Sequence, residues 1–97
     1  MGAPYGTTKP SSLTLNQRRT LLIAREKSSA GMDLALQPWV PIKETHAPAA
    51  AVRLVRMGLL EERVEYGPKG GKKVFVRPTP EGKRVADYIK VNRLKTY

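Results

Sequence analysis

Residues 63–82, RVEYGPKGGKKVFVRPTPEG, constrain the fold more than any other part of the chain. The runs LEERVEY and KVFVR alternate around Val64, Tyr66, Val74 and Val76, which is the pattern of a half-buried antiparallel pair of strands. The connecting loop GPKGGKK is longer than a tight hairpin turn needs, and it holds three glycines and three lysines. This stretch therefore predicts a β-hairpin with a long, cationic tip.

A helix is predicted directly after this hairpin. Thr79 offers a hydroxyl to cap the helix, Pro80 has the backbone angle of a first helical position, and Glu81 suits the positive end of the helix dipole. Apolar residues then recur at helical spacing, so the helix is expected over about 80–92. Pro78 lacks an N–H group, which predicts that the second strand is short or lies at a sheet edge.

Two helices are predicted before the hairpin. Thr14 and Gln17 have the spacing of a capping box, and the apolar pattern that follows predicts a helix over about 15–27. Another helix is expected from about Pro48 to Met57, with Gly58 as its terminating residue. The apolar side of this second helix consists of alanines followed by a leucine, so it can approach another helix closely.

For residues 31–46, the segment between these two helices, the sequence pattern predicts no regular secondary structure over the whole length. Pro38 and Pro41 exclude a long regular helix, although Pro41 can begin a short one that reaches about Glu44. Trp39 is the only tryptophan, and we expect it to anchor the core beneath the first helix.

Composition limits the chain to one small domain. Its 97 residues, 40% of them hydrophobic, suit a single core over residues 13–97, while residues 1–12 are rich in Gly, Pro, Ser and Thr and are expected to form a flexible tail. The absence of cysteine excludes disulfides and thiolate metal sites, and the single histidine, His46, has no second histidine with which to hold a metal. We expect neither a metal nor a cofactor. No apolar run is long enough to span a bilayer, and no signal peptide is evident, which predicts a cytoplasmic protein without membrane contact.

Charge points to a polyanionic partner. Eighteen Lys and Arg against eight Asp and Glu give a formal net charge of +10, and residues 63–97 hold ten of the basic residues but only three of the acidic ones. No enzyme signature is present: the chain has no nucleophilic cysteine, PKGGKK lacks the strand–loop–helix context of a phosphate loop, and the carboxylates are scattered. We therefore expect a binding protein with no evident small-molecule ligand.

The expected order of helix, short helix, helix, β-hairpin and helix is that of a winged helix-turn-helix domain. Within it, RLVRMGLLEERVEYGPKGGKKVFVRPTPEG resembles the segment from recognition helix to wing in transcriptional regulators of the MarR type, over about residues 47–88. The residues that carry the resemblance are Leu54 with Gly58-Leu59, Glu62-Arg63, and Thr79-Pro80-Glu81-Gly82. The expected fold class is therefore α+β, with a three-helix core, a β-hairpin wing and a C-terminal helix.

The resemblance implies that the chain binds double-stranded DNA, as a small transcriptional regulator or a DNA-associated accessory factor. The helix at about 48–57 would enter the major groove, and the wing at about 63–77 would lie along the adjacent backbone or minor groove. Arg53 and Arg56 would contact the groove, and residues at the preceding turn would contact phosphate or a base edge. The candidate DNA-binding residues are Thr45, His46, Arg53, Arg56, Lys69, Lys72 and Lys73.

The chain also departs from the family it resembles. Gly70 and Lys72 stand where family members carry an Asp that braces an Arg, and lysine lacks the planar fork that reads guanine, so the wing should hold phosphate more than it reads sequence. Ala49 and Val52 offer only methyl groups at the start of the groove-facing helix. Few residues remain for the long dimerisation helices of the family.

Two alternatives stay open. The chain is either a monomer, or a homodimer paired through a short extension of the last helix with Leu94 and Tyr97. A winged helix can also serve as a protein–protein or RNA-binding module in a larger assembly, with its basic surface against an acidic partner.

Overall fold

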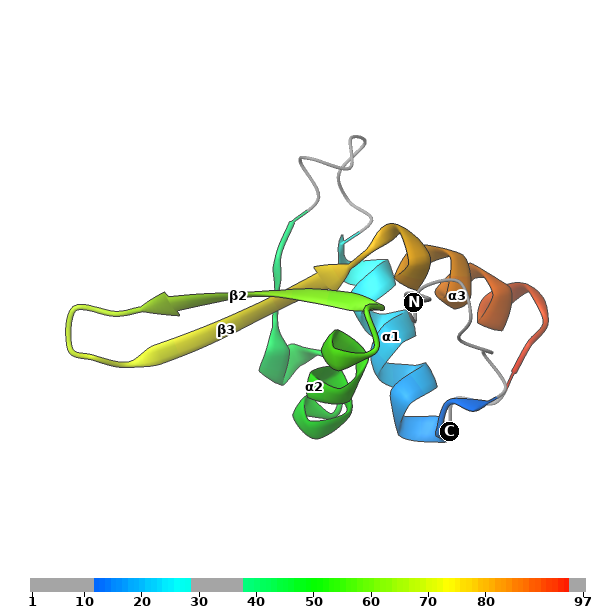
Figure 1. Cartoon of the computed structure of the whole chain (residues 1–97), viewed down its shortest axis with the longest axis horizontal. Helices are drawn as coiled ribbons and strands as arrows, with labels where there is room; N and C mark the ends of the chain where they lie inside the picture. Colours follow the sequence, from blue (N-terminus) through cyan, green and yellow to red (C-terminus); the bar gives the residue numbers. More distant parts are fainter. Residues whose placement is uncertain (1–11, 29–37, 95–97) are drawn as a thin grey trace, which may run out of the picture.

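The computed structural model of the chain describes residues 12–28 and 38–94, so the predicted tail before Ser12 and the predicted role of Tyr97 lie outside it. Its described residues form an α+β fold of three α-helices and a three-stranded antiparallel sheet, in which the β2–β3 hairpin projects away from the packed helices (Figure 1). In chain order the elements are α1 (Leu15–Ser28), β1 (Val40–Pro41), the short 3-10 helix η3 (Ile42–Glu44), α2 (Pro48–Arg56), β2 (Leu60–Tyr66), β3 (Lys72–Pro78) and α3 (Pro80–Val91).

Helix α1 begins where its capping box predicts. The backbone N–H of Gln17 donates to Thr14 Oγ1 at 3.1 Å, and the N–H of Thr14 donates to Gln17 Oε1 at 3.0 Å. The two bonds satisfy amide groups that the first turn of a helix otherwise leaves without partners. On its inner side α1 buries Leu21 and Ala24 completely.

Helix α2 begins at the predicted Pro48 and ends at Arg56, one residue before the predicted end. Pro48 occupies the first turn, and Ala51 and Leu54 are fully buried on one face. At the other end Gly58 has a φ of 78°, a left-handed conformation that favours glycine. The N–H of Leu59 then donates to the carbonyl of Leu54 at 3.0 Å, which closes the helix and directs the chain into β2.

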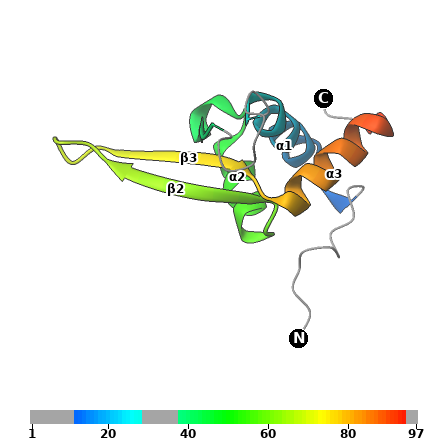
Figure 2. The same ribbon diagram turned by 90° about the horizontal axis from the view of Figure 1, so that it is seen from above.

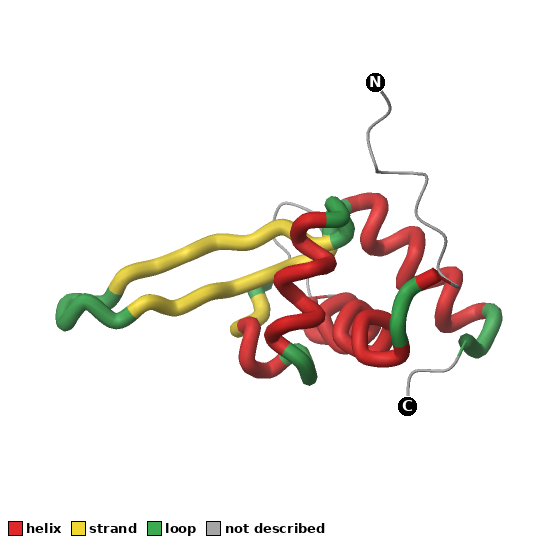
Figure 3. The backbone as a smooth tube through the Cα atoms, turned by 60° about the horizontal axis from the view of Figure 1, so that its bottom comes forward, coloured by secondary structure: helices red, strands yellow, loops and turns green. Residues whose placement is uncertain are grey.

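The predicted hairpin is present, and it belongs to a sheet with the strand order β1-β3-β2. Val64 lies opposite Val74, and the remaining pairs follow the same antiparallel register along both strands. The two-residue strand β1 was not predicted; it pairs with the base of β3, where Val40 lies opposite Val76 (Figure 3). The predicted short helix after Pro41 is present as η3.

The expectation that Pro78 shortens the strand or places it at an edge was wrong, because β3 is the central strand of the sheet. Pro78 is the last residue of β3, opposite Leu60. Strand β1 pairs only with Phe75 and Val76, so it ends before it reaches Pro78. The missing N–H group therefore removes no bond between β1 and β3.

Trp39 also differs from its expected place. It is only half-buried and is not among the core residues. Because Val40 pairs with Val76, the preceding residue lies next to Arg77, and the Arg77 guanidinium stacks over the indole at 4.3 Å from the ring centroid. The ring therefore covers one face of the sheet rather than the underside of α1.

Helix α3 begins at the predicted Thr79-Pro80 pair. The N–H of Gly82 donates to Thr79 Oγ1 at 3.0 Å, and the same hydroxyl donates to the carbonyl of Gly58 at 2.6 Å. Thr79 thus fastens the start of α3 to the end of α2. From their junction, the hairpin and α3 extend in opposite directions (Figure 2).

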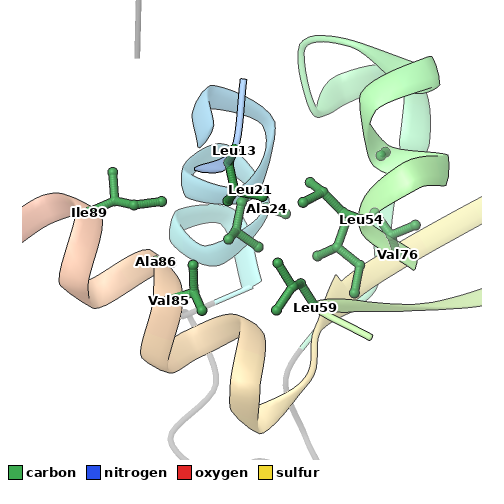
Figure 4. Close-up of a cluster of buried hydrophobic side chains, with 11 residues drawn as sticks. Leu13, Leu21, Ala24, Leu54, Leu59, Val76, Val85, Ala86 and Ile89 are labelled. Atoms are coloured by element: carbon green, nitrogen blue, oxygen red, sulfur yellow. The ribbon is translucent and has the colours of Figure 1, made fainter. Parts of the chain in front are cut away.

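The core lies where the three helices meet the base of the hairpin (Figure 4). Apolar side chains of α1, α2, β3 and α3 point toward one another there, and Leu59 is fully buried among them. The buried cluster comprises Leu13, Leu21, Ala24, Ala51, Leu54, Leu59, Leu60, Val76, Val85, Ala86 and Ile89. This core holds α2 and the hairpin base in a fixed relation to each other.

Candidate nucleic-acid interface

The outer face of α2 presents the two arginines that the sequence singled out. Arg53 and Arg56 are exposed, on the side of the helix away from the buried Leu54. Beside them lie exposed Ala49 and Val52, of which Val52 is 40% exposed. The face therefore combines two guanidinium groups with small apolar groups.

The two candidate residues in the turn before α2, Thr45 and His46, differ in their exposure to solvent. Thr45 is fully buried, and its hydroxyl donates to the Ile42 carbonyl at 2.6 Å. Its proposed contact with phosphate or a base was therefore wrong: the hydroxyl closes the turn after η3 and does not reach the surface. His46 is exposed with a φ of 95°, and its Nε2 lies 3.3 Å from Asn16 Oδ1.

A hollow of about 340 Å³ separates the first turns of α1 and α2. Arg53 borders it, and so do Asn16 and Gln17, which the sequence analysis did not identify as site residues. In the sequence, the only indication that Asn16 and Gln17 belong to a site is that they are polar residues at the start of a helix. The full lining is Thr14, Asn16, Gln17, Ala49, Ala50 and Arg53.

The tip of the hairpin holds the three predicted lysines in exposed positions. The loop closes through two backbone bonds, from Gly67 N to the Gly71 carbonyl at 2.7 Å and from Gly70 N to the Gly67 carbonyl at 2.9 Å. Glu65 is opposite Lys73 in the register, but its ion pair is with Arg63 at 3.1 Å. Across the described parts of the chain, no carboxylate forms an ion pair with Lys69, Lys72 or Lys73.

At the base of the hairpin, the basic side chain of Arg77 has partners within the protein. Arg77 Nε donates to Glu61 Oε1 at 2.5 Å, directly across the strands, and the same guanidinium stacks on Trp39. The sequence alone did not predict the row Trp39–Arg77–Glu61, because that row depends on the pairing of β1 with β3.

The candidate residues fall into two groups. His46, Arg53 and Arg56 gather at α2, and the three lysines gather at the hairpin tip, which lies away from α2 along the length of the hairpin (Figure 1). In residues 12–28 and 38–94, no helix has the length and apolar character needed to cross a membrane. Over the same residues, no three His, Asp or Glu side chains gather as a metal site would require.

Comparison with known proteins identifies no relative of this chain. The chain matches no protein-family model, no curated protein and no solved structure. Its function must therefore be argued from its own surfaces.

Proposed function

We propose that this chain is a winged helix-turn-helix protein that binds double-stranded DNA, as a small transcriptional regulator or a DNA-associated accessory factor. The observation that carries the proposal is the pair of exposed basic regions: two arginines on the outer face of α2, and three lysines at the end of a projecting hairpin that form no ion pair with the described residues. A formal net charge of +10 supports a polyanionic partner.

In this arrangement α2 lies in the major groove. An α-helix fits the width of that groove, and the planar guanidinium groups of Arg53 and Arg56 can donate two hydrogen bonds each to a guanine edge. The methyl groups of Ala49 and Val52 are suited to apolar contact with thymine methyls. Few polar side chains are available for reading bases, so sequence specificity is expected to be modest.

The hollow between α1 and α2 is suited to a phosphate of the DNA backbone. Arg53 supplies a positive charge at its border, and the starts of two helices carry partial positive charge. Asn16 Oδ1 is occupied by His46 Nε2, which leaves the Asn16 amide group to donate. Phosphate contacts of this kind position a protein on DNA without reading sequence.

The tip lysines provide a second backbone contact. Lysine is a compact charge on a flexible stem, so Lys69, Lys72 and Lys73 would bind phosphate oxygens with little preference for base sequence. Each phosphate that they neutralise releases counterions, and the affinity then depends on salt concentration.

The test compares two variants that lose the same charge. One replaces Lys69, Lys72 and Lys73 with alanine; the control replaces Arg84, Lys90 and Arg93 on and after α3, the helix that extends away from the hairpin (Figure 2). Binding to a labelled duplex of random sequence is measured by fluorescence anisotropy over a range of salt concentrations. We expect the tip variant to bind more weakly and to lose up to about 3 phosphate equivalents of salt dependence, with a smaller change in the control.

Two results would contradict the proposal. A tip variant that binds duplex DNA as wild type does would remove the hairpin from the interface. Equal losses in both variants would indicate attraction to net charge alone, without a defined binding face.

A further inference from the structure

Strand β3 has an open edge where β1 stops. Strand β1 pairs only with Phe75 and Val76, and at Ile42 the chain leaves the sheet to form η3. Strand β3 continues to Lys72, so its segment Lys72–Val74 has no neighbouring strand on that side among the described residues. An open edge of this kind presents main-chain groups to a partner.

The register shows which main-chain groups face the opening. Two backbone bonds, Gly67 N to the Gly71 carbonyl and Thr79 N to the Leu59 carbonyl, extend the hydrogen-bonded pairs of the β2–β3 ladder at either end. Because such pairs alternate along antiparallel strands, Lys73 and Phe75 direct their main-chain groups toward β2. Lys72 and Val74 therefore direct their N–H and C=O groups to the open side.

A groove of about 410 Å³ lies at this edge, between η3 and β3. Half of its lining is apolar and three of its side chains are lysines, while its one carboxylate, Glu44, is paired with Lys27 at 3.3 Å. The lining residues are Pro41, Ile42, Lys43, Glu44, Lys72, Lys73, Val74 and Phe75. The groove thus joins unpaired strand backbone to an apolar floor and a positive rim.

We propose that this groove binds an extended, acidic peptide segment of a partner protein, which adds to β3 as a further strand. A peptide backbone can both donate to the carbonyl groups and accept from the N–H groups of Lys72 and Val74. A DNA backbone has only acceptors to offer, so it leaves those carbonyls without partners. Alternating side chains of the peptide would place apolar groups on the floor and carboxylates near the lysines.

The outer edge of β2 provides an internal comparison. By the same alternation, Glu62 and Val64 direct their main-chain groups away from β3, so β2 also has an open edge within the part of the chain that the structure describes. However, β2 carries Glu61, Glu62 and Glu65 and only one basic residue, whereas β3 carries Lys72, Lys73 and Arg77 and no acidic residue. An acidic strand is therefore repelled at β2 and attracted at β3.

This inference does not rest on DNA binding, although the two surfaces share Lys72 and Lys73. The probe is a synthetic peptide of alternating glutamate and valine with blocked ends. Its binding is measured by fluorescence anisotropy and by amide chemical shifts of the 15N-labelled protein, without DNA present. We expect the largest shifts at Lys72–Val74 and Ile42–Glu44, on both sides of the groove.

Two controls isolate the main-chain contact. The same peptide with alternate amides N-methylated keeps its charge but loses donors, and it should bind at least about tenfold more weakly. In the protein, V74P removes an N–H group that faces the groove, while V64P removes the outward N–H group of the residue directly opposite. We expect V74P to lose binding and V64P to retain it, with each fold checked by its amide spectrum.

Three outcomes would overturn the proposal. The first is equal binding of the methylated and unmethylated peptides to wild-type protein, a result that can be measured even if V74P fails to fold. The second is a set of peptide-induced shifts centred on Lys69 or on α2, which would indicate attraction to charge alone. Lys72 and Lys73 belong to both surfaces, so the deciding shifts are those of Val74 and Ile42–Glu44: a duplex oligonucleotide that reproduces them would assign the groove to nucleic acid.

Discussion

The base and the tip of the β2–β3 hairpin hold their cations in different ways. At the base, Arg77 lies between Glu61 and Trp39, and Arg25 of α1 lies 3.4 Å from Asp87 of α3. At the tip, the loop from Gly67 to Gly71 contains a lysine and no acidic residue. Charges at the base are therefore compensated within the protein, whereas those at the tip form no ion pair with the described residues.

If the proposed function is correct, the base of the hairpin serves stability and its tip serves binding. The base contributes Leu60 and Val76 to the core, so changes there should alter the free energy of unfolding. Exposed lysines at the tip contribute little to folding, since surface substitutions away from packed or capped positions change stability by about 0.5 kcal/mol or less. Four substitutions test whether the base has this structural role, beginning with the largest expected effect.

Replacement of Gly82 by alanine should cause the greatest loss of folding stability among the four substitutions. A Cβ atom at this position would overlap the backbone carbonyl of Leu59, which cannot move without disturbing the junction of α2, β2 and α3. We expect a destabilisation of about 3 kcal/mol, at the upper end of the usual cost of overpacking, measured by denaturant unfolding. Gly71→Ala at the tip is the control, because a Cβ there meets nothing within 4 Å. Equal stability of the two variants would contradict the close packing of the base.

Replacement of Thr79 by alanine should have the next largest effect. It removes both the cap of the Gly82 N–H and the bond to the Gly58 carbonyl, at an expected cost of about 1 to 2 kcal/mol. Thr79→Ser keeps the hydroxyl and should retain most of the stability, as measured by thermal unfolding. If serine and alanine were equally destabilising, the hydroxyl would not be the group that fastens α3.

These two positions show what sequence could predict about the fold. Caps and helix starts depend on residues close together in the chain, so the Thr79-Pro80 pair and the Thr14 capping box were sufficient to place α3 and α1. Strand β1 could not be predicted in this way, because its two residues acquire their pairing only from β3, more than thirty positions later. Trp39 was misplaced for the same reason, since its stacking partner is supplied by that pairing.

For the candidate site too, local sequence patterns predicted some features, and features that depend on tertiary packing were not predicted. Exposure of Arg53 and Arg56 followed from helical periodicity, and exposure of the tip lysines followed from the length of the loop. Burial of Thr45 could not be foreseen, because its surroundings depend on how the turn after η3 packs. The groove beside β3 likewise exists only because β1 ends early, which no local pattern indicates.

Replacement of Glu61 by glutamine should have a smaller effect than the first two. It removes the charge that faces Arg77 at 2.5 Å, but both side chains are partly exposed, so the expected loss is about 1 kcal/mol or less. Glu62→Gln, one position away and exposed, is the matched control and should leave stability unchanged. Denaturant unfolding at low and high salt is the measurement, and the difference between the variants should shrink at high salt. A larger loss for Glu62→Gln would contradict the assigned pair.

The smallest expected effect concerns Lys83, in the first turns of α3. Partial burial, followed by the nearby charges of Arg25 and Arg77, lowers the pKa of its ammonium group from the ordinary lysine value of 10.5, despite attraction from Asp87 and Glu61. The folded protein thus binds this proton less tightly than the unfolded chain does. Stability should therefore rise as pH increases from the lowered pKa toward 10.5, and the charged lysine is slightly destabilising at neutral pH.

Lys83→Met removes this titration while keeping a long side chain. The variant should be slightly more stable than wild type at neutral pH, and its advantage should diminish toward about pH 10 as wild type loses the proton. Lys90→Met, on an exposed position of the same helix, is the control and should show no such trend. A Lys83→Met variant that is less stable at neutral pH would mean that Asp87 and Glu61 more than offset the burial and the two arginines. Every cation considered at the hairpin base would then be stabilised by nearby carboxylates, in contrast to the lysines at the tip.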